Sequence, residues 1–396
     1  MRKAAGIVVC LLIIWNPLIR PQNPTKLIIF PLDAVQVNEN LDWLREGIAI
    51  SISEQIDSPS LKLISRNERI RLVESLDLPP SGRLSRGSMI RIAQQAGIDL
   101  VVMGKFSGTE QNLKITLRIL DTPKLKFSGE IVANGPLSAM PQMENELAWL
   151  IVSNAGLQKA VTRAEFQKRM RRIPNSAFTH YIQSYNSSIK NVQIQSLKMA
   201  VEMYRDFPRA QFRLGQLYFS KRDCENALPH LAKAAPEGSA RQDSDFMQGT
   251  CYLTLDQPER AIQFLSRIPS NARSFDILNN LGVAYIRQGE ISLAQNMLLE
   301  ARKAAPADET VSLNLAIVFL VQGNYSAAQN TIEETIKVHP KDGMLQFIES
   351  ILLKKEGKVD MSEGFAERAK SQGINTDLLR SQDPKVWAKP KFGPDR

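Results

Sequence analysis

The residues that most often carry out chemistry in proteins are sparse in this sequence and lie far apart. None of its three histidines, His180, His230 and His339, has the spacing of a metal site or a catalytic triad. His339 directly precedes Pro340 at a predicted helix end, where a capping or cationic role is expected. The sequence also has no phosphate-binding glycine loop. It therefore predicts a protein that is not an enzyme and that holds no metal or cofactor.

The charged residues give no stronger sign of catalysis. Asp42, Glu46 and Glu54 share one predicted helix, where a solvated face is a better interpretation than an acid–base pair. The chain has 50 basic and 41 acidic residues and a net charge of +9. The one dense basic cluster, residues 163–172 (RAEFQKRMRR), is interpreted as a helix end and linker, with a lipid-facing or nucleic-acid-binding patch as the alternative. Nucleic acid is not an expected partner.

The N-terminal residues have the pattern of an export signal. Arg2 and Lys3 precede twelve apolar residues, 4–15, which suits a signal peptide and falls short of the roughly 20 residues that span a membrane. No small-x-small cleavage site follows, so residues 1–24 are predicted to be either a signal peptide or an uncleaved anchor. We expect an exported protein, in the bacterial periplasm or anchored to the membrane by this segment and facing the periplasm.

Cysteines are too few for a disulfide framework or a zinc site. Only Cys10, Cys224 and Cys251 occur, and export would leave the last two in an oxidising compartment. Stacked neighbouring helices could bring Cys224 and Cys251 together. Two separate small buried side chains are the favoured interpretation.

Residues 25–160 alternate between strand and helix patterns. The predicted elements are strands over residues 26–31 (KLIIFP) and 61–66 (LKLISR), helices over 41–56, 67–76 and 89–96, strands over 99–107, 112–120 and 124–133, and a helix over 137–160. The last strands alternate apolar and polar residues, as in an antiparallel sheet with one wet face. This order predicts a mixed α/β sandwich.

This first domain resembles the amino-terminal domain of TolB and the related CsgG-like and FlgO-like domains. The resemblance rests on KLIIFPL at residues 26–32, DWLREGIAISI at 42–52, LKLISR at 61–66, AGIDLVVMGKF at 96–106 and LKITLRILDT at 113–122. It covers about a third of the chain. The resemblance implies protein–protein docking in the cell envelope.

The second half contains a regular repeat. Leu278, Leu281-Gly282, Tyr285, Ala294, Leu298, Ala301 and Pro306 return at the same offsets as Ser312, Leu315-Ala316, Phe319, Ala328, Ile332, Thr335 and Pro340. This period and order of residue sizes resemble the tetratricopeptide repeat, in which two antiparallel helices form each unit of about 34 residues. Neighbouring units stack into a solenoid with a concave face, which usually binds another chain.

The predicted fold is therefore a two-domain α+β chain, a mixed α/β sandwich followed by an all-α repeat solenoid. A basic linker over residues 161–173 joins the domains, and the repeats occupy residues 174–376. The repeats are predicted at 208–241, 242–274, 275–308, 309–342 and 343–376, with a degenerate first copy at 174–207. The tail, 377–396, is predicted to be disordered, with a role as a short peptide ligand as an alternative.

The repeat resemblance implies a peptide groove on the first helix of each unit. Its predicted lining is Phe212, Phe219, Phe246, Leu253, Asn280, Val283, Ile286, Leu313, Asn314, Ile317, Leu320, Phe347 and Ile351. The two asparagines could hold a peptide backbone, and the apolar lining favours a helix or an apolar segment as ligand. The alternative is that these residues are buried by superhelical packing or by the chain's own tail.

The function predicted from these features is a non-catalytic adaptor of the bacterial cell envelope. The first domain would dock to one envelope component, and the repeat groove would bind a second protein. The alternative is a self-associating subunit of an envelope secretion or motility assembly.

Overall fold

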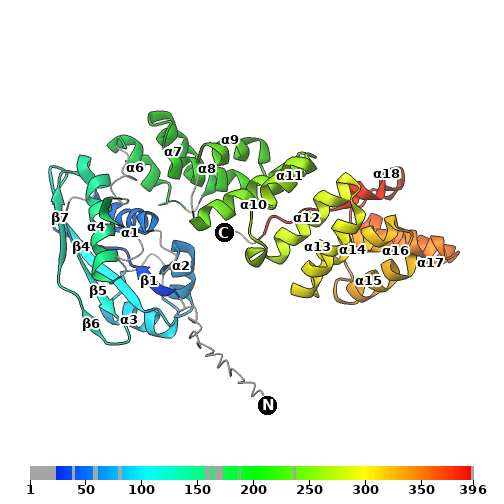
Figure 1. Cartoon of the computed structure of the whole chain (residues 1–396), viewed down its shortest axis with the longest axis horizontal. Coiled ribbons are helices and arrows are strands. Elements are labelled where there is room, and N and C mark those ends of the chain that lie inside the picture. Colours follow the sequence, from blue (N-terminus) through cyan, green and yellow to red (C-terminus); the bar gives the residue numbers. More distant parts are fainter. Residues whose placement is uncertain are drawn as a thin grey trace, which may run out of the picture. The chain divides into compact units, whose positions relative to one another are not determined.

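The computed structural model describes residues 24–37, 41–56, 61–78, 83–156, 162–164, 173–185, 187, 189–234 and 238–393. The predicted export signal and most of the basic cluster lie outside these residues. The chain divides between Met170 and Arg171 into two compact units, with Leu137–Ala139 grouped with the second (Figure 1). No helix among the described residues is both long and apolar enough to cross a membrane.

The first unit is built on a mixed β-sheet. Strand β1 lies between β3 and β4 and is parallel to both, because helices connect these strands along the chain. Strands β4 and β5 form an antiparallel hairpin, from Leu100 opposite Asp121 to Thr109 opposite Asn112. The strands are β1 Thr25–Ile29, β2 Asp33–Val35, β3 Leu61–Leu63, β4 Leu100–Thr109, β5 Asn112–Asp121, β6 Lys126–Phe127 and β7 Ile131–Gly135.

Helices cover both faces of this sheet. The helices are α1 Leu44–Gln55, α2 Arg66–Glu74, α3 Arg86–Gln95 and α4 Met140–Asn154. Ile28 of β1 packs in one apolar cluster with Val73 of α2 and Ile92 of α3. Leu27 and Ile29 alternate with Ile28 and are also buried, on the side where α1 contacts β1. The unit is thus a mixed α/β sandwich.

The predicted third strand of the antiparallel part is interrupted. The alternating pattern over residues 124–133 predicted one continuous strand, whereas the structure has the two short strands β6 and β7. Ser128 lies between them, and its hydroxyl accepts a hydrogen bond from the Ile119 backbone N–H of β5. The Ser128 hydroxyl thus replaces a backbone carbonyl that would accept this hydrogen bond in a continuous strand.

The second unit contains six antiparallel helix pairs among its described residues. They are α6 Asn175–Gln183 with α7 Lys190–Met203, α8 Pro208–Ser220 with α9 Cys224–Ala234, α10 Gly238–Thr254 with α11 Pro258–Leu265, α12 Phe275–Gln288 with α13 Ile291–Ala304, α14 Glu309–Val321 with α15 Tyr325–Val338, and α16 Gly343–Lys355 with α17 Val359–Ser371. Helix α10 begins at Gly238, slightly before the third predicted repeat.

A glycine in the first helix sets how closely three of these pairs pack. A methyl group added at Gly282 would lie 2.6 Å from Cγ of Leu298 in the partner helix. The same contact recurs at Gly215 with Leu231 and at Gly249 with Leu265, each leucine at the equivalent position of the second helix. Only a residue without Cβ lets the leucine fill this crossing. The contact explains the small residue in the sequence pattern.

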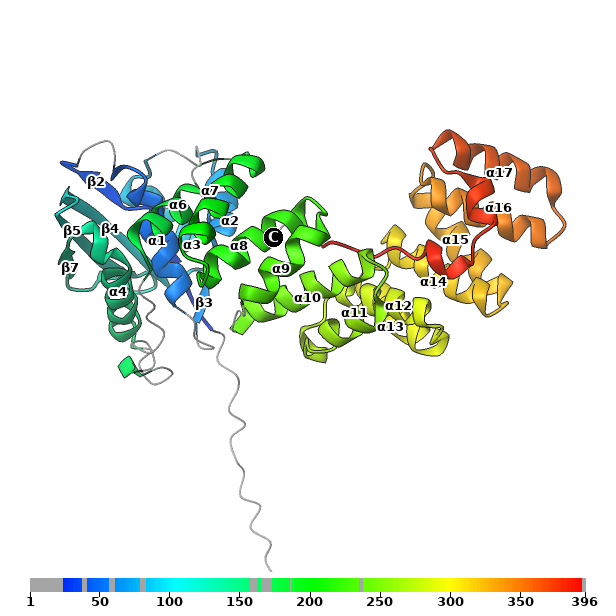
Figure 2. The same cartoon turned by 90° about the horizontal axis from the view of Figure 1, so that it is seen from above.

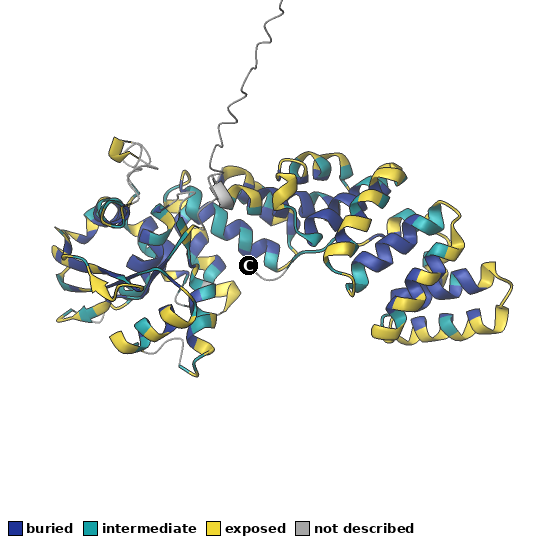
Figure 3. Cartoon of the chain, turned by 60° about the horizontal axis from the view of Figure 1, so that its bottom comes forward, coloured by how far each residue is buried: buried dark blue, intermediate teal, exposed yellow. Residues whose placement is uncertain are grey.

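The first helix of a pair is buried more extensively than the second. In α12 an unbroken stretch from Asp276 to Ala284 is buried, whereas α13 buries only Ala294, Leu298 and Ala301. Figure 3 shows the exposed residues gathered on the outer helices, as along α17. The first helices therefore have neighbours on several sides, and the C-terminal tail is one of them.

The tail is ordered where the structure describes it, which corrects the prediction of disorder over residues 377–396. After α17 the chain forms α18 Thr376–Arg380 and the short helix η4 Pro384–Trp387. It then runs back along the repeats without regular secondary structure as far as Gly393 (Figures 1 and 2). Trp387 is only 5% exposed, because it packs against the repeats.

Cys224 and Cys251 form a disulfide, which corrects the favoured interpretation of two separate side chains. Cys224 is the first residue of α9, and Cys251 lies in α10 of the next pair. Their Cα atoms are 5.0 Å apart, because stacking of successive pairs brings these helices into contact. The bond links the second and third helix pairs.

Candidate functional site

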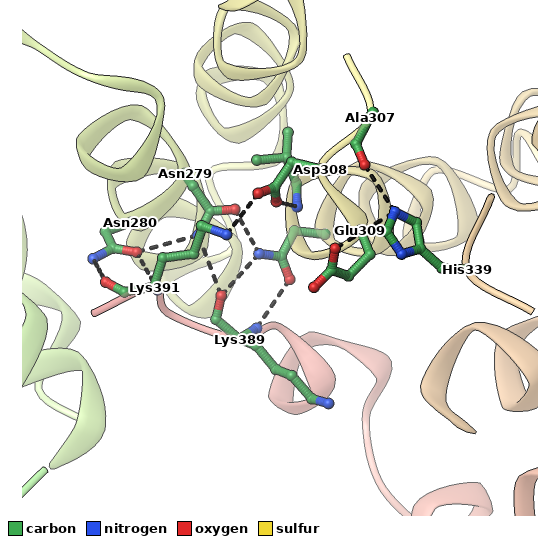
Figure 4. Close-up of polar contacts among 10 residues, drawn as sticks. Asn279, Asn280, Ala307, Asp308, Glu309, His339, Lys389 and Lys391 are labelled. Atoms are coloured by element: carbon green, nitrogen blue, oxygen red, sulfur yellow. Dashed lines mark hydrogen bonds and ion pairs between the residues drawn. The ribbon is translucent and has the colours of Figure 1, made fainter. Parts of the chain in front are cut away.

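Two asparagines on successive helix pairs hold the tail by its backbone. The amide of Asn314 on α14 accepts from the Lys389 N–H at 2.9 Å and donates to the Lys389 carbonyl at 2.9 Å. The amide of Asn280 on α12 does the same with Lys391, at 2.7 and 2.8 Å. Figure 4 shows the two backbone sites side by side. Each asparagine thus satisfies both backbone groups of one tail residue.

Other polar side chains fix the orientation of these two amides. Asn279 accepts a hydrogen bond from Nδ2 of Asn314 at 2.8 Å and donates to the Lys389 carbonyl at 3.3 Å. Thr250 Oγ1 accepts from Nδ2 of Asn280 at 2.9 Å. All three asparagines have no exposed surface, so a lost partner would be costly. The amides are therefore preorganised for a peptide backbone.

Asparagines of successive repeats bind alternate residues of the tail. Asn280 and Asn314 occupy equivalent positions in successive units, and they bind alternate residues of the tail, Lys391 and Lys389. Two residues of extended chain span roughly 6.6 Å. The intervening residue is Pro390, which has no N–H to satisfy. Successive repeats therefore bind alternate residues of the tail, through one asparagine each.

An aromatic contact lies beyond each end of the asparagine pair. Toward the last helix pair, the Trp387 ring meets Phe347 edge-on, with ring centroids 5.0 Å apart. Toward the second pair, Phe392 packs against Phe219, also at 5.0 Å, and the Arg222 guanidinium lies over its ring at 4.9 Å. We call Phe219, Phe246, Asn280, Asn314 and Phe347, with the helices that carry them, the tail-binding face.

Charged side chains add direct contacts to the tail. Lys391 Nζ lies 2.7 Å from Oδ2 of Asp308, and both side chains are mostly buried. The other carboxylate oxygen of Asp308 caps α14 through the Val311 N–H, so the carboxylate is held in place. Arg287 donates to the Ala388 carbonyl at 3.2 Å. The tail-binding face therefore binds the side chain of Lys391 as well as the backbone of the tail.

The structure brings five of the predicted groove residues to the tail. These are Phe219, Asn280, Asn314, Phe347 and Phe246, the last lying beside Gly393. The others are on the same first helices, with Leu253, Val283, Ile286, Leu313 and Ile317 buried and Phe212, Leu320 and Ile351 half-buried. Four residues that bind or support the tail were not predicted from the sequence: Asn279, Arg287, Asp308 and Thr250. Asp308 had a visible signal as a helix cap, but nothing in the sequence marked it as a tail contact.

The residues considered for catalysis have structural roles where the structure shows their partners. His230 Nδ1 lies 2.7 Å from Oε1 of Gln211, and burial lowers the pKa of His230. His339 contacts the Ala307 carbonyl at 3.0 Å (Figure 4). Glu46 does not lie on a purely solvated face, because it forms ion pairs with Arg66 and Arg69. Among the described residues, no group of three or more histidines, cysteines or carboxylates could hold a metal.

The comparison with protein families concerns part of the helix pairs. A model of the tetratricopeptide repeat matches residues 279–328, the segment that carries Asn279, Asn280 and Asn314. This segment of the chain is similar to the tetratricopeptide repeat. Such repeats mediate protein–protein interactions and are typically non-catalytic scaffolds. No curated protein matches the chain.

Several solved structures are similar to part of the chain. A structure of MamA is 15% identical with a TM-score of 0.36, covering 44% of this chain and 98% of that one. YrrB, described as a tetratricopeptide repeat protein with an unusual peptide-binding site, is 19% identical with a TM-score of 0.38, covering 46% and 94%. The pilF protein of Pseudomonas aeruginosa is 15% identical with a TM-score of 0.40, covering 52% and 94%. The likeness of the first unit to the TolB amino-terminal domain stays a prediction.

Proposed function

We propose that this chain is an exported, non-catalytic adaptor of the bacterial cell envelope, and that its tail-binding face binds a segment of another envelope protein. The proposal rests on the hydrogen bonds that Asn280 and Asn314 form with a peptide backbone. Backbone hydrogen bonds do not depend on the side chains of the bound segment, so the same amides suit a segment of another protein.

The hydrogen-bond pattern favours an extended segment over a helix as ligand. Each asparagine takes both the N–H and the carbonyl of a single residue, and the next contact is two residues away. A helix uses these groups internally and has none free in its middle turns. The expectation of a helix or an apolar segment therefore narrows to an extended segment with apolar ends.

The first unit serves in this proposal as the docking domain. Its resemblance to TolB-type domains and the export pattern of residues 1–24 support a place in the envelope. The N-terminal segment would either be removed after export or keep the protein at the membrane.

Site-specific photo-crosslinking in cells tests the adaptor. A photoreactive phenylalanine analogue at Leu320, half-buried on α14, should capture a partner protein. The matched control is Leu299, 44% exposed on the outer helix α13, which should capture none or a different set. Equal capture at both positions, or none at Leu320 even in a chain whose tail is released, would count against the proposal.

Two further measurements test location and assembly. Cell fractionation should recover the chain with the periplasm or the membranes, and recovery from the cytoplasm would refute the envelope assignment. Mass measurement in mild detergent should give a small assembly. A large discrete ring would replace the adaptor by a self-associating subunit of a secretion or motility assembly.

A further inference from the structure

The tail-binding face is filled by the chain's own last residues, and this shows what else it would accept. We propose that residues 387–393 are a built-in competitor for this face. We also propose that its external ligand is an extended segment with the same pattern, an aromatic residue followed four positions later by a basic residue and then a second aromatic one. The inference rests on the proposed function and names the chemistry of its partner.

The tail itself shows which positions of a ligand matter. The side chain of Lys389 is exposed, and the face contacts this residue through its backbone alone. Lys391 is contacted through both its backbone and its ammonium group, which meets Asp308. Trp387 and Phe392 supply the apolar contacts at the two ends. The recognised pattern is thus Trp387, Lys391 and Phe392, with free choice at residue 389.

The polarity of the face suits the backbone of any segment in the conformation of the tail. Asn279, Asn280 and Asn314 are buried amides, which an interior would bury at lower cost if they were apolar side chains. Their hydrogen bonds to the tail repay that cost for any peptide in the same conformation. Apolar residues at these positions would instead leave the N–H and carbonyl groups of the bound backbone without partners.

One feature of the tail fits a segment that can be displaced. The indole N–H of Trp387 is buried, and no acceptor lies within hydrogen-bond distance of it among the described residues. An unpaired buried donor weakens the docked state. A ligand with phenylalanine at this position, or with an acceptor beside its indole, would bind better than the tail does.

The tail is tethered close to the face, which sets the size of the competition. Only the short segment from Ser381 to Asp383 separates α18 from η4. A short tether gives an effective concentration on the order of 1 mM. If the isolated segment binds with a Kd of about 10–100 μM, the docked tail lowers the apparent affinity for an external ligand by roughly 10- to 100-fold.

The test uses full-length chains and a fluorescein-labelled peptide with the sequence of residues 384–393, PKVWAKPKFG. The W387A/F392A variant weakens the docked tail, so the probe should bind it at least about 10-fold more tightly than the wild type. Adding N280A/N314A to that variant should abolish probe binding. K389A is the matched control and should bind as the wild type does, because its side chain makes no contact with the face.

The result that would overturn the inference is equal probe affinity for the wild type and W387A/F392A. Unaltered binding after N280A/N314A would also overturn it. Far-UV circular dichroism and thermal unfolding check that each variant is folded. W387F provides a second route, since it keeps the ring contact with Phe347 and should leave the probe excluded.

Failure of this inference differs from failure of the proposed function. Release of the tail by W387A/F392A should increase photo-crosslinking of the partner at Leu320. Equal crosslinking in both chains would refute the competitor and leave the adaptor standing. Absence of crosslinking in both chains would refute the adaptor itself.

Discussion

Removal of the Asn314 amide should release the tail from the repeats. Asn314→Ala deletes the two hydrogen bonds to the Lys389 backbone, both of 2.9 Å. It leaves the Lys389 N–H without its acceptor, whereas the Lys389 carbonyl keeps the Asn279 donor at 3.3 Å. A typical net contribution is about 0.5–1.5 kcal/mol for each hydrogen bond, so the loss is about 1–3 kcal/mol. Because about 1.4 kcal/mol corresponds to a factor of ten, the opening equilibrium of the tail should rise roughly 5- to 150-fold.

Amide hydrogen exchange, resolved at single residues, measures this opening. The N–H of Lys389 loses its acceptor in the variant, so its faster exchange alone would be a local effect. The N–H of Lys391 still faces Oδ1 of Asn280, and its exchange reports opening of the whole segment. Protection of Lys391 should fall by this factor of roughly 5 to 150, and protection of Lys389 should fall by at least as much.

Two comparisons decide whether the reasoning holds. Lys389→Ala should leave the protection of Lys391 unchanged, since its exposed side chain is not part of the contact. Asn280→Ala should weaken the protection of both residues in the same way as Asn314→Ala. Protection of Lys391 within twofold of the wild type in Asn314→Ala would show that the amide contributes little to docking.

Three other expectations concern stability. Reduction of the Cys224–Cys251 disulfide, or replacement of both cysteines by serine, should lower the free energy of unfolding by about 3–4 kcal/mol. This figure comes from the loop-closure model for a sequence separation of 27 residues. Urea denaturation with and without reductant measures the change. Gly282→Ala should lower the free energy of unfolding by about 1–3 kcal/mol, because the added methyl group would clash with a buried leucine. Gly364→Ala should raise it by about 0.5–1 kcal/mol, because this glycine lies in the interior of α17 with open space around it. Equal shifts of the melting temperature in the two variants would contradict the packing argument. Burial raises the pKa of Glu349, so the folded state binds this proton more tightly than the unfolded state does. The free energy of unfolding should therefore fall as pH rises from the ordinary carboxyl range through the raised pKa. Glu349→Gln should remove this fall, and identical pH profiles of stability in the variant and the wild type would refute the expectation.

The repeats were predictable because their signal is local and periodic. The pairing of a glycine with a leucine of the following helix depends on two helices adjacent in sequence, so it recurs visibly in Gly215, Gly249 and Gly282. Strand β5 was predictable for a similar reason, since burial on one face imposes alternation, whereas the three-residue strand β2 was not predicted. The break between β6 and β7 was not, because it depends on a contact of Ser128 with a neighbouring strand.

The helix pairs, the apolar character of their first helices and the suitability of Asn280 and Asn314 for a peptide backbone were predictable from the amino-acid sequence. The disulfide between Cys224 and Cys251 and the binding of the tail to the tail-binding face depend on three-dimensional packing. Lys391 and Asn280 lie far apart in the sequence, and no periodicity of the chain links them. Their contact depends on the stacking of successive helix pairs, which sets both the path of the face and the point where the chain turns back along it.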